Sequence, residues 1–239
     1  MTTTSHLIAT LQQHSATFAP VVPFCLNSPR IWHIDLTAAN PVLHRINLAD
    51  TQALADYIFG EMQNRNALAA IGGYNEERFL YHRSAHFNGS SEPRTIHLGI
   101  DIWAPVNTPI AAPTDGIVHS FANNCHFGDY GYTIILEHHL AGYRFFTLYG
   151  HLSAPSLVGL YEGKSIGKGE TFAWFGNAQE NGNWPPHLHF QLITDMGSRK
   201  GDFPGVCAKS ERNYYLSICP NPAVLLGWQT SAITFETKS

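Results

Sequence analysis

Two neighbouring stretches of the sequence, YTIILEHHL (132–140) and RFFTLYGHL (144–152), decide the fold of this chain. Each is a short apolar run of strand length, and Gly, Pro, Asn and Asp residues separate such runs from one another. Further runs of the same kind lie on either side: HLGIDIWAP (97–105), DGIVHSFAN (115–123), GETFAWFG (169–176) and HLHFQLI (187–193). Several short strands at this spacing predict a mainly β domain, built as a barrel or a sandwich.

The first 90 residues follow a different pattern. IWHIDLT (31–37) has the character of a strand. Apolar residues then recur at helical spacing from about Asp50 to Arg65, and Asp50 or Thr51 can cap the start of that helix. The Gly pair that opens IGGYNEERFLYHRS (71–84) indicates a turn. We interpret this region as a small α+β cap or adaptor.

The chain is therefore expected to divide into three parts. Residues 1–90 form the N-terminal α+β region, residues 91–196 the β domain, and residues 197–239 a loop-rich C-terminal tail that packs on the β domain. The tail is assigned as loop because GDFPGVC (201–207) and ICPNP (218–222) are rich in turn residues. The charged run Glu76–Glu77–Arg78 is interpreted as a solvent-exposed face.

Composition limits the class of protein. The chain has 239 residues, of which 44% are hydrophobic, so a core can be built. Only 13% of residues are charged and the net charge is −4, which argues against nucleic acid as a partner. No run approaches the ~18 apolar residues that a membrane helix needs, so we expect no membrane insertion. The sequence does not determine the oligomeric state.

The compartment is predicted from the first residues and the cysteines. MTTTSHLIATLQQHSATFAP (1–20) has no basic start and no apolar core of a signal peptide. The four cysteines show no CxxC pair and are interpreted mostly as reduced, buried thiols. We expect a cytoplasmic protein. A periplasmic or secreted location would require export by another route, and a Cys207–Cys219 disulfide is the alternative for that case.

Histidine is the unusual residue: the chain has 14, as many as Lys and Arg together. His97 and Asp101 in HLGID are expected on one face of a strand, where an imidazole and a carboxylate can bind a metal such as zinc. His187 and His189 in PPHLHFQL share a strand face, with apolar neighbours on the other. His151 follows Gly150 at the end of a strand, where functional groups collect.

Each of these signals has a plainer interpretation. His97 and Asp101 can be a strand histidine with a capping aspartate. His187 and His189 can be a solvated pair, and His151 a turn histidine bonded to backbone. His138 and His139 are expected to mark a strand end, with one of them bonded to a backbone carbonyl.

Taken in order, the three motifs HxxxD, YGHL and HLHF resemble the lysostaphin-type zinc metallopeptidases, a family of peptidoglycan endopeptidases. IDIWAPVNTPIAAPTDGIV (100–118) and GKSIGKGETFAWFGN (163–177) are similar to the family in the adjoining segments. The resemblance covers about residues 94–194. It departs from the family pattern at GNAQENGNWPP (176–186) and at Gln191, where an acidic residue is common.

The resemblance implies a barrel-sandwich core of the duplicated hybrid type and a single zinc ion. The ligands of that ion would be His97, Asp101 and His189, while His151 and His187 would act on water and on the transition state. Two neutral imidazoles and one carboxylate around Zn²⁺ leave a net charge of +1 and an open position for water. The implied substrate is a peptide, in peptidoglycan crosslinks or fragments.

Two other functions remain open at this point. The first is a cytoplasmic zinc-containing module that binds a ligand or partner without hydrolysis. The second is phosphoryl transfer by paired histidines, although the carboxylate of HxxxD favours a metal. Four aromatic residues are candidates for cleft walls, with packing as the favoured interpretation: Trp103, Tyr130, Tyr132 and Trp184.

Overall fold

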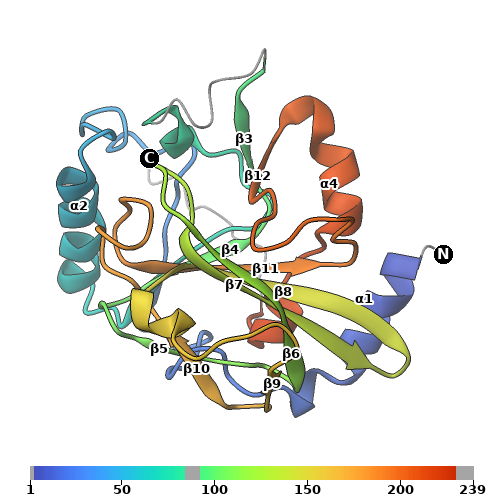
Figure 1. Cartoon of the computed structure of the whole chain (residues 1–239). Coiled ribbons are helices and arrows are strands. Elements are labelled where there is room, and N and C mark those ends of the chain that lie inside the picture. Colours follow the sequence, from blue (N-terminus) through green and yellow to red (C-terminus); the bar gives the residue numbers. More distant parts are fainter. Residues whose placement is uncertain (1–2, 84–91, 230–239) are drawn as a thin grey trace.

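A single eight-stranded sheet organises the molecule. The computed structural model describes residues 3–83 and 92–229, and Figure 1 shows the sheet running through the middle of the view. Its strand order is β1-β2-β4-β11-β8-β7-β6-β9. The bounds are Ile31–His33 (β1), Ala69–Gly72 (β2), Ile100–Trp103 (β4), His187–Ile193 (β11), Tyr143–Leu152 (β8), Gly131–Leu140 (β7), Gly116–Asn124 (β6) and Ser165–Ile166 (β9).

Two small antiparallel sheets accompany the large one. One joins β5 (Pro109–Ala111) to β10 (Thr171–Trp174), and the other joins β3 (Arg94–His97) to β12 (Val206–Ala208). The predicted mainly β class is thus confirmed. Within the described part of the chain the large sheet is open, because β1 and β9 end its hydrogen-bonded order and do not pair with each other.

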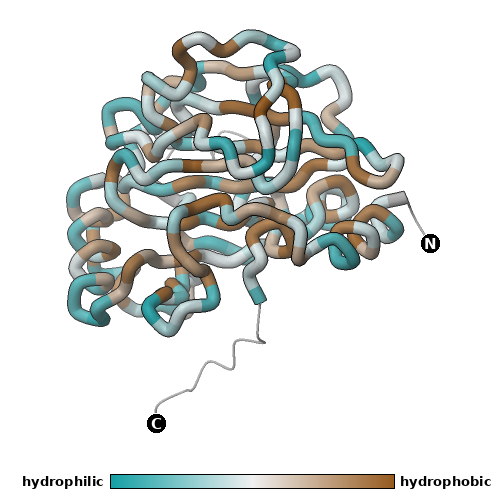
Figure 2. The backbone as a smooth tube through the Cα atoms, turned by 90° about the horizontal axis from the view of Figure 1, so that it is seen from below, coloured by the Kyte–Doolittle hydropathy of each residue, from teal (hydrophilic) through white to brown (hydrophobic). Residues whose placement is uncertain are grey.

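The central strands are buried on both faces, as their unbroken apolar runs require. On one face, residues such as Phe145, Tyr149 and Phe190 join the main hydrophobic core with β5 and β10. On the other face, Phe146 and Leu148 join a second cluster with residues of the C-terminal segment. Figure 2 shows brown, hydrophobic stretches running through the molecule and teal, hydrophilic ones mostly along outer loops.

The N-terminal region adds to the same sheet. β1 pairs with β2 in parallel, and β2 pairs with β4 in antiparallel fashion. The predicted helix is confirmed as α2, Thr51–Asn64, and the Asp50 carboxylate caps it by accepting from the backbone N–H groups of Gln52 and Ala53. The strand expected over 31–37 is shorter and ends at His33. A further helix, α1, spans Thr3–Gln13, with a 3₁₀ turn η1 (Ser15–Thr17) after it.

The segment after residue 196 contains more regular structure than its turn residues suggested. Strand β12 is followed by a 3₁₀ turn η4 (Lys209–Glu211) and by helices α4 (Arg212–Ile218) and α5 (Ala223–Leu226). β12 pairs with β3, which fixes this segment against the β domain. Two further 3₁₀ turns, η2 (Phe79–Arg83) and η3 (Ala154–Leu157), complete the described elements. The division at 90/91 and 196/197 stays a prediction, and residues 84–91 and 230–239 of those regions lie outside the described part.

Two further features bear on the sequence-based expectations. No helix in the described ranges is both long enough and apolar enough to cross a membrane. All four cysteines are free thiols, and they differ in exposure: Cys207 and Cys219 are buried, whereas Cys25 and Cys125 are exposed, contrary to the expectation that most would be buried.

Candidate metal centre and active site

Strand register brings Asp101 and His189 together. In the antiparallel pair of β4 and β11, Asp101 lies directly opposite His189, and Trp103 lies opposite His187. On the other side of β11, His189 lies opposite Gly150 of β8. The alternation along β11 sends Leu188 and Phe190 into the main core, as predicted, so the two imidazoles lie on the opposite face.

His97 reaches the same point from a different strand than expected. His97 and Asp101 were expected on one strand, but His97 ends β3 and Asp101 belongs to β4, in a different sheet. Residues four apart on one straight strand are about 13 Å apart, because a strand rises about 3.3 Å per residue. The break at Leu98–Gly99 folds the chain so that His97 Nε2 lies 3.2 Å from Asp101 Oδ1.

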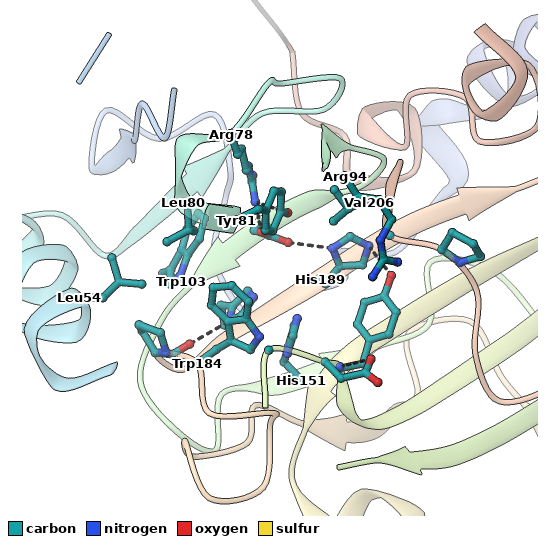
Figure 3. A pocket seen from close by; sticks show the side chains of 18 of the residues that line it. Leu54, Arg78, Leu80, Tyr81, Arg94, Trp103, His151, Trp184, His189 and Val206 are labelled. Atoms are coloured by element: carbon teal, nitrogen blue, oxygen red, sulfur yellow. Dashed lines mark hydrogen bonds and ion pairs between the residues drawn. The ribbon is translucent and has the colours of Figure 1, made fainter. Parts of the chain in front are cut away.

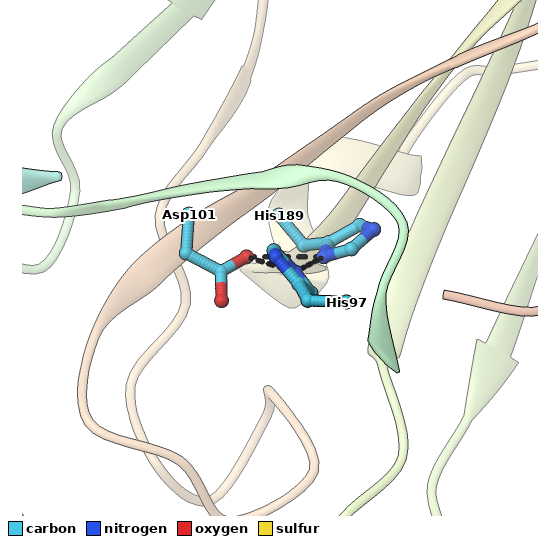
Figure 4. Close-up of side chains that lie close together, drawn as sticks. All are labelled: His97, Asp101 and His189. Carbon is cyan, nitrogen blue, oxygen red and sulfur yellow. Dashed lines mark hydrogen bonds and ion pairs between the residues drawn. The ribbon is translucent and has the colours of Figure 1, made fainter. Parts of the chain in front are cut away.

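The three side chains form a compact triangle of donor atoms (Figure 4). His97 Nε2 and His189 Nδ1 are 3.0 Å apart, and His189 Nδ1 is 3.0 Å from Asp101 Oδ1. Donors around a tetrahedral zinc, each about 2.0–2.1 Å from the ion, lie about 3.3 Å from one another. The donor set and its spacing therefore fit a zinc ion.

The outer hydrogen bonds of the two imidazoles fix their tautomers. His97 Nδ1 donates to the backbone carbonyl of Gly73 (3.0 Å), and His189 Nε2 donates to Gln191 Oε1 (2.9 Å). The amide of Gln191 is oriented by its own NH₂ group, which donates to the carbonyl of Pro204 and to Cys219 Sγ. In the neutral imidazoles the inner nitrogens therefore carry lone pairs, and three acceptors face one another across the triangle. A bound cation satisfies that arrangement, as does a proton on one of the inner nitrogens.

A buried arginine completes the charge pattern. Arg78 is 1% exposed and pairs through Nη1 with Asp101 Oδ2. Burial alone would raise the pKa of Asp101, but the neighbouring His97 and Arg78 hold that pKa well below its usual range. The run Glu76–Glu77–Arg78 was expected to be exposed to solvent. This is wrong for Arg78 and for Glu76, because the Glu76 side chain is only 14% exposed, and it is right for Glu77, whose side chain is 54% exposed.

His151 and His187 lie beside the triangle as a stacked pair, with ring centroids 4.0 Å apart. His151 Nδ1 donates to the carbonyl of Asn181 and His187 Nδ1 to the carbonyl of Pro185, each at 2.8 Å. The Nε2 atom of each neutral ring therefore carries the lone pair. Burial lowers the pKa of His187 to about 4 and holds that of His151 well below its usual value, so both are neutral at pH 7.

The backbone at His151 is unusual. Its φ of +64° lies in the left-handed region, which residues other than Gly and Asn seldom adopt. Backbone hydrogen bonds on both sides hold it there: His151 N donates to Tyr130 O at 2.8 Å, and Gly176 N donates to His151 O at 2.9 Å. Such conformations cluster at functional sites.

A cavity of about 140 Å³ opens onto this group of side chains (Figure 3). Asp101, His151, His187 and His189 all line it, whereas His97 lies behind them and is fully buried. Of the four candidate wall residues, three line the cavity: Trp103, Tyr130 and Trp184. Tyr132 packs against the main core instead.

Gly99 explains why the break between β3 and β4 can approach β11. A Cβ atom at Gly99 would lie 2.6 Å from His189 Cε1 and 2.8 Å from the carbonyl oxygen of Phe190. The glycine in HLGID therefore leaves the space that His189 occupies.

Outside this group, the histidine pair of β7 lies within the strand, which continues to Leu140, and one of the two bonds a backbone carbonyl as predicted. His138 is buried, and its Nδ1 donates to the backbone carbonyl of Asp115 at 2.9 Å. His139 is exposed and lies 2.8 Å from Glu137 Oε1. Neither belongs to the triangle of metal donors.

Sequence reasoning missed the residues that orient the five candidates. Gln191 could have been found, because it follows His189 by two positions and so shares its strand face. Arg78 and the Gly73 carbonyl carried no such signal, because they come from a segment distant in sequence and their role depends on the pairing of β2 with β4.

Comparison with known proteins supports the resemblance. Residues 95–200 match the model of Peptidase family M23. The DD-carboxypeptidase/endopeptidase Mpg of Neisseria meningitidis serogroup B is 34% identical over 134 residues, which are 54% of this chain and 28% of that protein. The peptidoglycan DD-endopeptidase ShyA of Vibrio cholerae is 30% identical over 97 residues, or 41% of this chain and 20% of that protein. The chain thus spans less than a third of the length of these relatives.

Among solved structures, the catalytic domain of lysostaphin from Staphylococcus simulans is similar, with 24% identity and a TM-score of 0.38. The match covers 56% of this chain and 81% of that domain. The family match begins within β3 and contains all five candidate residues. Residues 95–200 of this chain are thus similar to peptidase family M23.

Proposed function

We propose that this chain is a zinc-dependent metalloendopeptidase that hydrolyses a peptide bond in peptidoglycan crosslinks or fragments. One observation carries the proposal. The inner atoms of His97, Asp101 and His189 are three lone-pair donors within 3.0–3.2 Å of one another, with their outer hydrogen bonds already made. This arrangement supports one resident zinc ion, held by three protein donors with a fourth position free.

The ion would supply Lewis acidity, which activates water and polarises the scissile carbonyl. The remaining work falls to the chain itself. His151 and His187 present neutral Nε2 atoms toward the cavity, and either atom can accept a proton from the attacking water and later donate it to the leaving amine. We assign the base and the oxyanion or leaving-group partner to these two residues jointly.

The cavity walls support a short, partly apolar peptide as the substrate. Leu54 and Leu80 of the N-terminal region line the cavity, together with Tyr81 and Trp184. Asp129 and Asp202 also line it. Mpg is named a DD-carboxypeptidase/endopeptidase and ShyA a peptidoglycan DD-endopeptidase, so crosslinked peptidoglycan peptides are the first substrates to test.

Zinc analysis combined with a hydrolysis assay tests the proposal. The wild type should contain one equivalent of zinc and should cleave crosslinked peptidoglycan peptides, and a chelator should abolish cleavage. His189→Ala should lose the zinc. His151→Ala should keep it and lose hydrolysis by two or more orders of magnitude. His139→Ala, which removes an exposed histidine of β7, is the matched control and should behave as wild type.

Full zinc occupancy in His189→Ala would show that the ligand set is wrong. Wild-type turnover in His151→Ala would show that the catalytic assignment is wrong.

A zinc-containing binding module is the second candidate. It is favoured by the burial of the site, since Asp101, His151, His187 and His189 are each at most 6% exposed. Such a module would bind peptidoglycan peptides and zinc but release no new amine, which the same assay detects. Phosphoryl transfer is less well supported, because a phosphocarrier needs no carboxylate between its histidines. The cytoplasmic location stays a prediction.

A further inference from the structure

We propose that Arg78 is a positioning residue that keeps Asp101 a one-oxygen ligand, so that the fourth position at the ion stays open. Arg78 precedes the family-matched residues 95–200, so the N-terminal region would complete the site. The inference rests on the proposed zinc site and goes beyond it, because it assigns a role to a residue outside the family-matched segment.

The two oxygens of Asp101 have different partners. Oδ1 faces the imidazoles, 3.2 Å from His97 Nε2 and 3.0 Å from His189 Nδ1. Oδ2 faces away from them and accepts a hydrogen bond from Arg78 Nη1. A carboxylate with one oxygen held in this way can offer only the other to an ion.

The guanidinium is itself held from several sides. Arg78 Nε donates to Glu76 Oε2 at 2.8 Å, and Nη1 is 3.3 Å from the hydroxyl of Tyr81. The guanidinium carbon lies 5.9 Å from the ring centroids of both Tyr81 and Trp103. These contacts fix both the position and the direction of the donor that reaches Asp101.

The absence of a side chain at Gly72 leaves space for the Arg78 guanidinium. Gly72 of β2 pairs with Asp101 of β4. A Cβ atom at Gly72 would lie 2.8 Å from Arg78 Nη2 and 2.9 Å from two ring atoms of Trp103. The glycine therefore leaves room for the guanidinium beside the carboxylate, which links this strand of the N-terminal region to the geometry of the site.

Loss of the guanidinium has a specific consequence. Asp101 would remain buried and negatively charged, and both of its oxygens would be free to turn toward a bound cation. A second carboxylate oxygen at the ion would fill the position that the reaction requires. Metal binding should therefore survive while hydrolysis fails, which is the opposite of what simple damage to the fold would cause.

The test uses Arg78→Met in the full chain, with Glu77→Gln as the matched control. Glu77→Gln changes the exposed neighbour of Arg78, which pairs with Lys209, and leaves the Arg78–Asp101 contact in place. The measurements are zinc affinity by chelator competition, the absorption spectrum of the Co²⁺-substituted protein, and kcat and KM on crosslinked peptidoglycan peptides.

We expect Arg78→Met to bind zinc no more weakly than the wild type. Its Co²⁺ bands should weaken, as they do when a four-coordinate site gains a ligand, and kcat should fall about 10–100-fold with KM little changed. Glu77→Gln should keep the wild-type spectrum and kcat. Arg78→Lys keeps the positive charge but lacks the planar guanidinium with its several N–H donors. It should therefore lower kcat less than Arg78→Met does.

A wild-type Co²⁺ spectrum and kcat in Arg78→Met would overturn the inference, as would equal losses in Arg78→Met and Glu77→Gln. If Arg78→Met does not fold, a wild-type spectrum and kcat in Arg78→Lys would overturn it. These outcomes are distinct from failure of the proposed function, in which the wild type itself would bind no zinc or cleave no peptide.

Discussion

Replacing Gln191 with methionine tests whether hydrogen bonds around the ligands prepare the site for an ion. Gln191→Met keeps nearly the same volume at a fully buried position and removes the acceptor of His189 Nε2–H, now at 2.9 Å. The Tyr130 hydroxyl, at 3.4 Å, is a poorer substitute. A buried N–H group left without a good acceptor costs about 1–3 kcal/mol.

That cost falls on one tautomer of His189. In the variant, the imidazole gains by moving its proton to Nδ1, where it can donate to Asp101 Oδ1 at 3.0 Å. An ion must then displace this proton, so the zinc affinity should fall about 10–100-fold, or about 1.4–2.7 kcal/mol. Removing the hydrogen-bond partner of a metal-bound histidine typically lowers metal affinity by this amount.

Competition with a chromophoric chelator at fixed pH measures the change. Gln191→Glu is the control, because it retains an acceptor for His189 and should bind zinc at least as tightly as the wild type. The reasoning is refuted if Gln191→Met folds normally and its zinc dissociation constant lies within twofold of the wild-type value.

Three further predictions concern the fold and its pH dependence. Gly99→Ala should displace His189, because the new methyl group would lie 2.6 Å from its Cε1 atom. The variant should contain less zinc than the wild type while keeping the wild-type circular dichroism spectrum. A variant with one full equivalent of zinc would contradict this. His138 is buried and neutral, with a pKa lowered to about 4 by burial, so its contribution to stability is complete above pH 6.5 and is lost as the pH falls toward 4. Between pH 7 and pH 5 this loss is about 2 kcal/mol of unfolding free energy. Urea unfolding at several pH values should show the free energy of unfolding falling more steeply with decreasing pH in the wild type than in His138→Gln. The same pH dependence in both proteins would count against this role. Asp50→Ala should destabilise the protein by about 0.5–2 kcal/mol through loss of the α2 cap, and an unchanged urea midpoint would disprove that role.

The apolar runs were sufficient to predict the strands of the β domain. Runs such as RFFTLYGHL are buried on both faces in the structure, which is why they are apolar throughout rather than alternating. The helix at Thr51–Asn64 was also predictable, because its apolar spacing and its aspartate cap are both local features. The helices α4 and α5 were not, because they are short and begin and end among turn residues.

The residues of the candidate site were predictable from the sequence, but the strands that bring them together were not. The motifs named the five histidine and aspartate positions, and the structure places all five around one cavity or directly behind it. The assumed single strand for His97 and Asp101 was wrong, because strand alternation describes which face a residue shares but not how far apart two residues lie.

By itself, the sequence determined the residue types of the site, the strands of the β domain and the helix α2. Alternation, capping and turn chemistry act over a few residues, so they can be read along the chain. The tertiary structure alone decided that Arg78 and the Gly73 carbonyl orient the ligands. Their partners lie on other strands, and only the pairing of β2 with β4 brings a buried charge and a hydrogen-bond acceptor to the right atoms. Such contacts depend on register, and no local pattern encodes register between segments far apart in the chain.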